Sequence, residues 1–129
     1  MRTLIQRVAS AQAFEAGVRN KSIAAITQGL VILAGFEESD SLVTIEQMAH
    51  KIRSLRIFSD ASGKMNLAPS EVEAQYLVVS QFTLYAECKY GNRPSFDKAA
   101  PKARAKEYYE HFVQTMKRAV PESLQWTPF

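Results

Sequence analysis

The first third of the chain alternates between apolar and polar residues, a pattern typical of β-strands. The alternation runs with some irregularity over Thr3–Phe14 and returns over Ser22–Ile26, with turn residues between the two segments, so a hairpin is predicted. A second turn at Thr27–Gly29 leads into Leu30–Phe36, which is apolar enough for a central strand. We therefore expect three antiparallel strands at the start of the chain.

Two later segments have the apolar spacing of amphipathic helices. The first carries one apolar stripe over Leu42–Ile52, and any residue of Ser39–Ser41 suits its N-cap. The second is predicted from Pro101 to about Arg118, and Pro121 stops it. The residues predicted on its inner side are Ala105, Tyr108, Tyr109, Phe112, Val113 and Met116.

Shorter segments complete the pattern. Leu55–Phe58 has the composition of a short strand, Ser59–Gly63 that of a loop, and Pro69–Val72 that of one helical turn. A strand is predicted over Tyr76–Leu84, and Val120–Phe129 is apolar enough to begin a last strand. The elements together indicate a mixed α/β fold.

The predicted strand over residues 76–84 ends in an unusual way. Its first half, Tyr76–Val79, is the most apolar run of the chain, yet Ser80, Gln81 and Thr83 follow at once. A buried polar group costs free energy unless it is paired. Two interpretations are open: these groups bond neighbouring backbone at a strand end, or the strand end is a site where backbone amides and two hydroxyls face a ligand.

Length and composition limit the class of protein. A chain of 129 residues with 47% hydrophobic and 22% charged residues is expected to form one globular domain over residues 1–129. Its apolar runs are too short to span a bilayer and no signal peptide is evident, so we expect a cytoplasmic protein without membrane contact. A single cysteine, Cys88, allows no internal disulfide, and His50 and His111 alone make no zinc site, so no metal is expected.

Positive charge is concentrated in the last third of the chain. Residues 1–88 hold eight Lys and Arg against nine Asp and Glu, whereas residues 89–129 hold eight against four. The cations lie directly after the polar strand end, with Tyr90 and Phe96 among them, so they favour an anionic partner. The alternative is an ordinary solvated helix face with loop lysines. The basic residues are Lys89, Arg93, Lys98, Lys102, Arg104 and Lys106.

The candidate chemistry lacks a general base. Ser80 and Thr83 have no His, Asp or Glu near them in sequence except Glu87, and a hydroxyl alone is a poor nucleophile. Backbone amides at a strand end can bind a developing oxyanion whatever the side chains are. On an extended strand residues 81 and 83 share one face and residues 80 and 82 the other. A bulge or a strand end must therefore intervene if all four act together.

Several ordered motifs are spread over essentially the whole chain, and they are Met1–Val8, Arg56–Phe58, Gly63–Leu67, Val78–Leu84 and Arg93–Phe96. Together they resemble the D-aminoacyl-tRNA deacylase family. The resemblance implies an antiparallel-rich, barrel-like sheet with two main helices packed outside. It implies an ester hydrolase that releases a D-amino acid, or mischarged glycine, from tRNA, without a cofactor. The implied partners are aminoacyl-tRNA and a second copy of the chain, in a homodimer with active sites at the interface, and no DNA.

The resemblance also assigns roles to residues. Ser80, Gln81, Phe82 and Thr83 match the family's first active-site motif, in which Thr83 corresponds to a proposed nucleophile. The alternative in the family is that the ribose 2′-hydroxyl of the substrate assists water while amides around Phe82 hold the substrate, and the lack of a base favours this alternative. Arg7 matches a family arginine near the active site and Met65 and Asn66 fall at the pocket rim, so the resemblance implies substrate binding by these three residues; for Arg7 a structural salt bridge is the alternative. The basic stretch would then meet tRNA phosphates through Lys89, Arg93, Lys98 and Lys102.

The chain departs from the family pattern at its end. Members continue past the position of Phe129 into a strand and a second motif with a Gly-Pro dipeptide that excludes L-amino acids, and no Gly-Pro dipeptide occurs in these 129 residues. We expect a truncated chain, and weakened chiral selectivity if it is complete. Two other functions stay open: a non-catalytic RNA-binding or replication-associated module on the same fold, and a deacylase with specificity for an L-amino acid or glycine.

Overall fold

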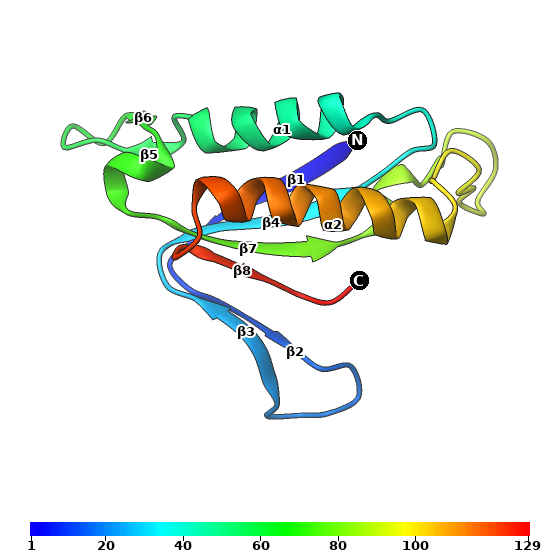
Figure 1. The fold of residues 1–129 in the computed structure, drawn as a ribbon, viewed down its shortest axis with the longest axis horizontal. Helices are drawn as coiled ribbons and strands as arrows, with labels where there is room; N and C mark the ends of the chain where they lie inside the picture. Colours follow the sequence, from blue (N-terminus) through cyan, green and yellow to red (C-terminus); the bar gives the residue numbers. More distant parts are fainter.

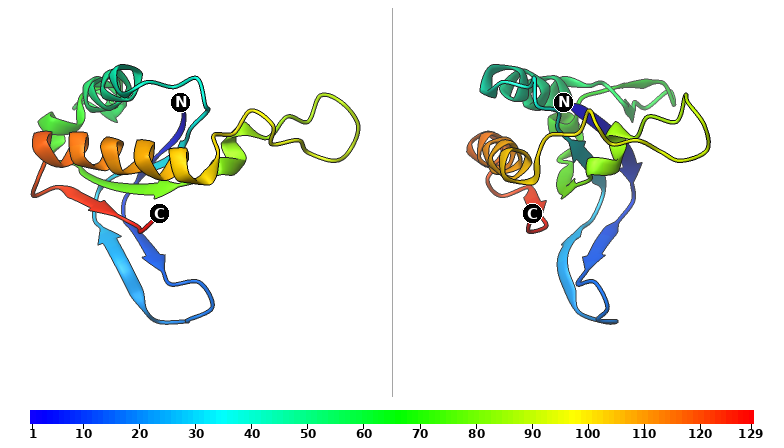
Figure 2. Two further views of the ribbon diagram at one scale, coloured as in Figure 1. Left: turned by 45° about the vertical axis from the view of Figure 1, so that its right-hand side comes forward. Right: turned by 90° about the vertical axis from the view of Figure 1, so that its right-hand side faces the viewer.

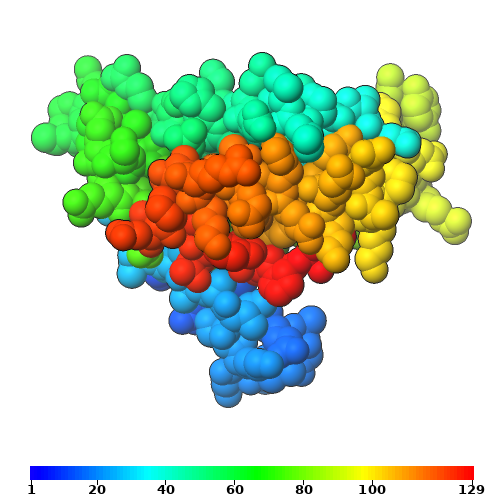
Figure 3. Space-filling model, in the orientation of Figure 1, coloured from blue at the N-terminus to red at the C-terminus, as the bar shows by residue number.

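The computed structural model describes residues 1–129 and begins with a long, bent β-ribbon (Figure 1). Its upper half is the antiparallel pair β1 (Arg2–Val8) and β4 (Gly29–Gly35), in a register that joins Arg2 to Gly35 and Val8 to Gly29. Its lower half is the antiparallel pair β2 (Ala11–Phe14) and β3 (Ser22–Ile26). This hairpin, called the arm below, projects from the body of the protein (Figure 3).

The prediction of one strand over residues 3–14 is therefore wrong, and the chain has four strands here instead of three. Val8, Ala11 and Ala13 all pack on the same small cluster around Leu77. An unbroken strand keeps one face at a spacing of two residues, so the spacing of three between Val8 and Ala11 requires a break. That irregularity is where the ribbon bends.

The main sheet has the order β1-β4-β7-β8, with β7 over Gln75–Ser80 and β8 over Leu124–Trp126. β1 and β4 are antiparallel, whereas β4 pairs with β7, and β7 with β8, in parallel. The predicted mixed α/β class is confirmed, but the four strands form an open sheet. β4 and β7 are the central strands: the helices cover one face, and Ala24 and Ile26 of the arm pack against Leu77 on the other face. Burial on both faces explains why both strands are so apolar.

The two main helices are α1 (Leu42–Ser54) and α2 (Lys102–Ala119), and both cover one face of the sheet (Figure 2). Ser41 caps α1, because its side chain accepts a hydrogen bond from the Thr44 N–H while the Thr44 hydroxyl accepts one from the Ser41 N–H. All six residues predicted for the inner side of α2 are buried. No helix combines the length and the apolar character that a membrane crossing would need.

Two predicted strands are shorter than expected. The segment at residues 55–58 contributes only to β5 (Phe58–Ser59), which pairs with β6 (Met65–Leu67). β7 ends at Ser80, and residues 82–85 form a single 3₁₀ turn instead of continuing the strand. The last ladder bond runs from the Gln81 N–H to the Ala34 carbonyl oxygen at 2.8 Å. Since β4 itself ends one residue later, the chain has no neighbouring strand with which to continue.

Candidate active site

The predicted site lies where β7 gives way to the turn η2 (Phe82–Tyr85). Gln81 is extended, with φ −149° and ψ 92°, and the Leu84 N–H returns to the Gln81 carbonyl oxygen at 3.4 Å. The strand therefore ends between Ser80 and Phe82, which is the condition under which residues 80–83 can act together. The N–H groups of Phe82 and Thr83 precede the first hydrogen bond of the turn, so neither has a partner within it. Two adjacent amide donors are therefore available at this strand end.

A pocket of about 250 Å³ lies beside the turn. Phe82 is 58% exposed and forms part of the pocket wall, and Phe129, the last residue of the sequence, also lines the pocket. Small residues of β4 and α2 leave the space open, because no long side chain fills it. The pocket residues are Ala34, Gly35, Phe36, Ser80, Gln81, Phe82, Ala100, Ala105 and Phe129.

The hydroxyl of Thr83 has an amide donor as its side-chain partner. Nε2 of Gln81 donates a hydrogen bond to Oγ1 of Thr83. A donor cannot remove the hydroxyl proton, so this contact does not activate Thr83 as a nucleophile. The one acidic candidate nearby in sequence is engaged elsewhere: Glu87 accepts a hydrogen bond from the Lys89 N–H at 3.1 Å and pairs with Nζ of Lys98 at 3.6 Å.

Two residues that the sequence interpretation missed support the turn from behind. A Cβ on Gly35 would lie 2.9 Å from the Gln81 carbonyl oxygen, so only glycine allows this approach. A glycine inside a strand pattern was a usable signal for a close backbone contact. Arg2 donates through Nη1 to the Leu84 carbonyl oxygen at 3.0 Å. No local signal could have found Arg2, because its partner lies 82 residues away.

Tyr85, the last residue of the turn, is almost completely buried at 2% exposure. Burial, together with the nearby Asp40 and Glu37 carboxylates, raises the pKa of Tyr85 far above its ordinary value, although Arg2 opposes this shift. The phenol therefore stays neutral across the physiological range. It serves as a fixed aromatic floor for the turn.

The basic residues predicted to meet phosphate lie at the same end of the sheet. Lys89, Arg93 and Lys98 are exposed on the basic loop, defined as residues 86–101, and Lys102 is the first residue of α2. The loop extends away from the body of the protein (Figure 2). It touches the site through one aromatic pair, in which the rings of Phe96 and Phe82 meet edge to face with centroids 5.2 Å apart.

The other predicted substrate-binding residues lie at the opposite end of the sheet. Arg7 pairs with Leu30 of β4, whereas Ser80 pairs with Ala34, which lies four residues further along the same strand. Its Nη1 donates to the Ile57 carbonyl oxygen at 2.8 Å. Met65 and Asn66 belong to β6 at this same end, and Asn66 accepts hydrogen bonds from the guanidinium of Arg56. Within one chain, the fold separates these three residues from the turn.

The remaining candidate groups lie elsewhere. His50 is exposed on α1, and Nε2 of His111 meets Oε1 of Glu46 at 2.9 Å, which links α2 to α1. Cys88 is exposed on the basic loop. No cluster of three His, Cys, Asp or Glu side chains is arranged to hold a metal ion.

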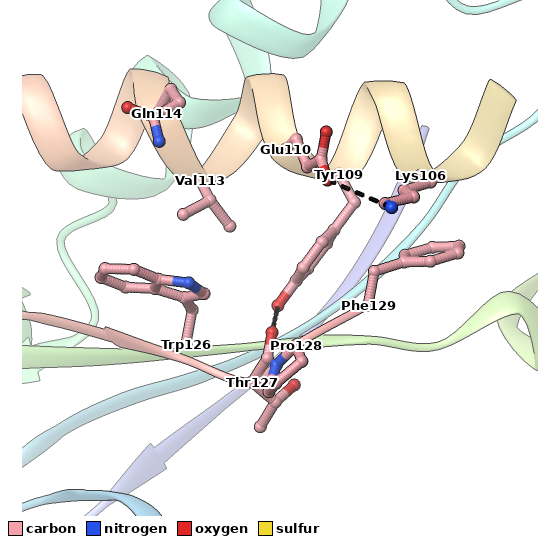
Figure 4. A pocket seen from close by; sticks show the side chains of 9 residues that line it. All are labelled: Lys106, Tyr109, Glu110, Val113, Gln114, Trp126, Thr127, Pro128 and Phe129. Carbon is pink, nitrogen blue, oxygen red and sulfur yellow. Dashed lines mark hydrogen bonds and ion pairs between the residues drawn. The ribbon is translucent and has the colours of Figure 1, made fainter. Parts of the chain in front are cut away.

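A second pocket of about 340 Å³ lies between α2 and the C-terminal segment (Figure 4). The Tyr109 hydroxyl crosses it and donates its one proton mainly to the Thr127 carbonyl oxygen at 2.6 Å, with the Val78 carbonyl oxygen as a second, longer acceptor at 3.2 Å. Phe129 lines both this pocket and the one beside the turn. The second pocket is thus bridged by structural hydrogen bonds that fasten the C-terminal segment to β7.

The family model and the curated relatives that match this sequence are all described as deacylases of D-aminoacyl-tRNA. A family model described as D-Tyr-tRNA(Tyr) deacylase matches residues 4–129. Curated relatives named D-aminoacyl-tRNA deacylase include one from Desulfatibacillum aliphaticivorans, 48% identical over 116 residues, which are 90% of this chain and 77% of the relative. Another, from Haemophilus influenzae, is 42% identical over 123 residues, which are 95% of this chain and 83% of the relative.

Two solved structures have the same fold. The c-Myc DNA Unwinding Element Binding Protein superposes with a TM-score of 0.89 at 33% identity, over 100% of this chain and 85% of that one. A probable eukaryotic D-amino acid tRNA deacylase superposes with a TM-score of 0.76 at 16% identity, over 91% of this chain and 67% of that one. The second likeness concerns the fold alone.

Proposed function

Because this chain belongs to the D-Tyr-tRNA(Tyr) deacylase family, we propose that it hydrolyses the ester bond between a D-amino acid, or mischarged glycine, and tRNA. The products are the free amino acid and a tRNA with a free 3′-terminal ribose. One structural observation carries the proposal: the residues Ser80, Gln81, Phe82 and Thr83 present two amide donors and a pocket at a strand end, next to an exposed basic loop.

The proposed chemistry uses backbone donors rather than a protein nucleophile. Water attacks the ester carbonyl carbon, the bond between that carbon and the ribose oxygen breaks, and the ribose oxygen takes up a proton. The N–H groups of Phe82 and Thr83 stabilise the negative charge that develops on the carbonyl oxygen. No side chain of the turn accepts a proton from water, which favours assistance by the 2′-hydroxyl of the substrate. An aminoacyl ester is reactive, so positioning and oxyanion stabilisation suffice.

Contacts with the tRNA backbone are assigned to the basic loop and the start of α2. Lys89, Arg93, Lys98 and Lys102 are all exposed and lie at the same end of the sheet as the turn. Phe96 of the loop touches the Phe82 ring, so the loop and the turn are neighbours. A tRNA whose phosphates contact the loop would therefore have its 3′ end near Phe82.

We further propose that the active form is a homodimer with its sites at the interface. In a two-fold dimer the same surface of each copy faces the other. Such symmetry allows Arg7, Met65 and Asn66, which lie far from the turn of their own chain, to approach the turn of the second copy. The separation of these residues within one chain supports this arrangement.

One observation favours a second function. The likeness to the c-Myc DNA Unwinding Element Binding Protein, at 33% identity over the whole chain, fits a nucleic-acid-binding module without catalysis. This alternative needs the basic loop but not the amide donors of the turn. The two functions therefore differ in a single measurable property, the hydrolysis of an aminoacyl ester.

The test is the release of labelled tyrosine from D-tyrosyl-tRNA and L-tyrosyl-tRNA by the purified 129-residue chain. We expect release from the D-substrate well above spontaneous hydrolysis, and the ratio of the two rates measures chiral selectivity. Glycyl-tRNA in a third reaction tests the specificity for glycine. Binding of tRNA without faster ester hydrolysis would instead support the non-catalytic module.

A further inference from the structure

The turn η2, which carries the amide donors, is held by one side chain from the N-terminal end of the chain. Nη1 of Arg2 donates to the carbonyl oxygen of Leu84 at 3.0 Å, and the guanidinium carbon lies 4.5 Å from the centroid of the Tyr85 ring. Arg2 thus contacts two consecutive residues of η2 at once. Its own backbone is fixed, because Arg2 pairs with Gly35 at the end of the main sheet.

The contact with Leu84 satisfies a group that the turn itself leaves free. The last carbonyl groups of a helical turn lack partners within the turn. Here the Thr83 carbonyl oxygen accepts the Ala86 N–H at 3.1 Å, and the Leu84 carbonyl oxygen accepts Arg2. A hydrogen bond from a charged donor is shorter and stronger than one from a neutral donor. The direction of the Leu84 peptide is therefore fixed by Arg2.

The contact with Tyr85 requires the shape of arginine. The planar guanidinium stacks on an aromatic face while its N–H groups still donate in the plane, which an ammonium group cannot do. Tyr85 does not move easily, because it is 2% exposed and packs against Gly35, where an added Cβ would lie 3.4 Å from its ring. Arg2 is held between a rigid platform and the carbonyl that it orients.

We propose that Arg2 is a positioning residue of the deacylase site, a role that rests on the proposed function. Arg2 touches no reacting atom. It sets the direction of η2, and a four-residue turn closed by its own hydrogen bonds moves as one unit, so Arg2 also sets the direction of the Phe82 and Thr83 N–H groups. Those donors act only when they point to the place where the oxyanion forms.

The kinetic test compares Arg2→Met, Arg2→Lys and the parent chain on D-tyrosyl-tRNA. Methionine keeps the length of the side chain without its donors, and a displacement near 1 Å costs up to about 100-fold in rate. We expect kcat to fall about 10- to 100-fold in Arg2→Met, with KM within about threefold of the parent. Arg2→Lys should recover only part of kcat, since the charge returns without the stacking plane.

A matched control is Arg19→Met, because Arg19 is an exposed arginine in the turn between β2 and β3, and this arm projects away from the main sheet (Figure 1). It should retain the parent kcat. Arg2→Ala should regain activity on addition of millimolar guanidinium, and Arg19→Ala should not respond. An Arg2→Met chain with parent kcat and parent melting temperature would overturn the proposal. So would a loss of kcat that follows only a lower melting temperature and is not rescued by guanidinium.

Amide hydrogen exchange tests the same role without a substrate. In Arg2→Met the N–H groups of Leu84 and Ala86, which are hydrogen-bonded to the carbonyl oxygens of Gln81 and Thr83, should exchange at least about tenfold faster than in the parent, while those of β4 keep their protection. If the parent chain proves unable to hydrolyse D-tyrosyl-tRNA, the proposed function fails, yet this measurement still decides whether Arg2 holds the turn. Unchanged exchange of both amides would overturn the role of Arg2.

Discussion

Gly35 and Gln81 approach each other so closely that a single methyl group would separate them. A Cβ at Gly35 would meet the Gln81 carbonyl oxygen at 2.9 Å and Cβ of Leu84 at 3.1 Å. Gly35→Ala must therefore push η2 away from β4. We expect a loss of about 1–3 kcal/mol in the free energy of unfolding and a fall in kcat of about 10-fold or more. Urea unfolding and steady-state deacylation measure the two effects.

A variant of similar stability separates these effects. Ile52 is fully buried in α1, away from the turn, and Ile52→Val should cost about 0.5–1.5 kcal/mol. It should keep the parent kcat at a temperature where both chains are folded. Equal kcat losses in the two variants would mean that Gly35 acts through stability alone.

The side chain of Thr83 should be dispensable. Its hydroxyl accepts a hydrogen bond from Gln81 and has no base beside it, so Thr83→Ala is expected to keep deacylation within about tenfold of the parent. Loss of a true nucleophile costs roughly 10⁴- to 10⁶-fold. Single-turnover rates at saturating enzyme measure the difference. Thr83→Val, which keeps the shape of the side chain without the hydroxyl, should behave in the same way. A fall in the deacylation rate of several orders of magnitude with unchanged tRNA binding would establish Thr83 as the nucleophile.

The N–H of Phe82 can be removed by substitution. Phe82 is the first residue of η2, a position that tolerates proline, and Gln81 before it is already extended. Phe82→Pro should lower kcat by about 10²- to 10³-fold, the usual cost of one oxyanion donor. Phe82→Ala keeps the N–H and loses the ring, with its contact to Phe96 and its part of the pocket wall, so its loss of kcat should be much smaller. Equal rates for the two variants would show that the ring, and not the amide, matters.

Binding of tRNA should weaken as salt is added. Each phosphate neutralised by the protein contributes about −0.7 to −0.9 to the slope of log K against log salt. Replacing both Lys89 and Arg93 by Gln should therefore make the slope less negative by about 1–2, as fluorescence anisotropy can measure. Lys51→Gln, on the exposed side of α1, should leave the slope unchanged. A parent affinity independent of salt would exclude phosphate contacts by the basic loop.

Alkaline pH should destabilise the fold. Burial raises the pKa of Tyr76, Tyr85 and Tyr109 above the ordinary tyrosine value. The unfolded chain releases these phenolic protons first, so the free energy of unfolding falls as pH rises above about 10 and is insensitive to these groups below it. Urea unfolding followed through tyrosinate absorbance measures this decline. Tyr109→Phe should show a shallower decline, and a stability that rises above pH 10 would contradict the assignment.

The spacing of apolar residues along the chain was sufficient to predict the helices and their buried sides, but not the pairing of the strands in the sheet. The inner side of α2 follows from residue spacing alone, since its buried positions from Ala105 to Met116 recur at spacings of three and four residues. Ser39, Asp40 and Ser41 looked equivalent as caps because all carry short side-chain acceptors, and only the reciprocal contact with Thr44 selects Ser41. The parallel pairing of β4 with β7 has no local signature, because any apolar strand satisfies it.

The same distinction applies to the site. Ser80, Gln81 and Thr83 were recognisable as polar residues that an apolar strand cannot explain. Their arrangement was not, because the turn begins where β4 ends, and the end of β4 is a property of another segment. The role of Arg2 depends on its contact with Leu84, 82 residues away in the chain. No short stretch of sequence contains both residues.

That contact also bears on the order in which the molecule assembles. Closing a chain segment of 82 residues costs more entropy than closing any hairpin, and contacts of long sequence separation slow folding. The ribbon of β1 and β4 can form from the first 35 residues, but the turn gains its support only after residues 80–85 have joined the sheet. In a refolding experiment we therefore expect the amides of Phe82 and Thr83 to acquire their orientation after the ribbon and the helices have formed, so that recovery of ester hydrolysis lags behind recovery of helical signal.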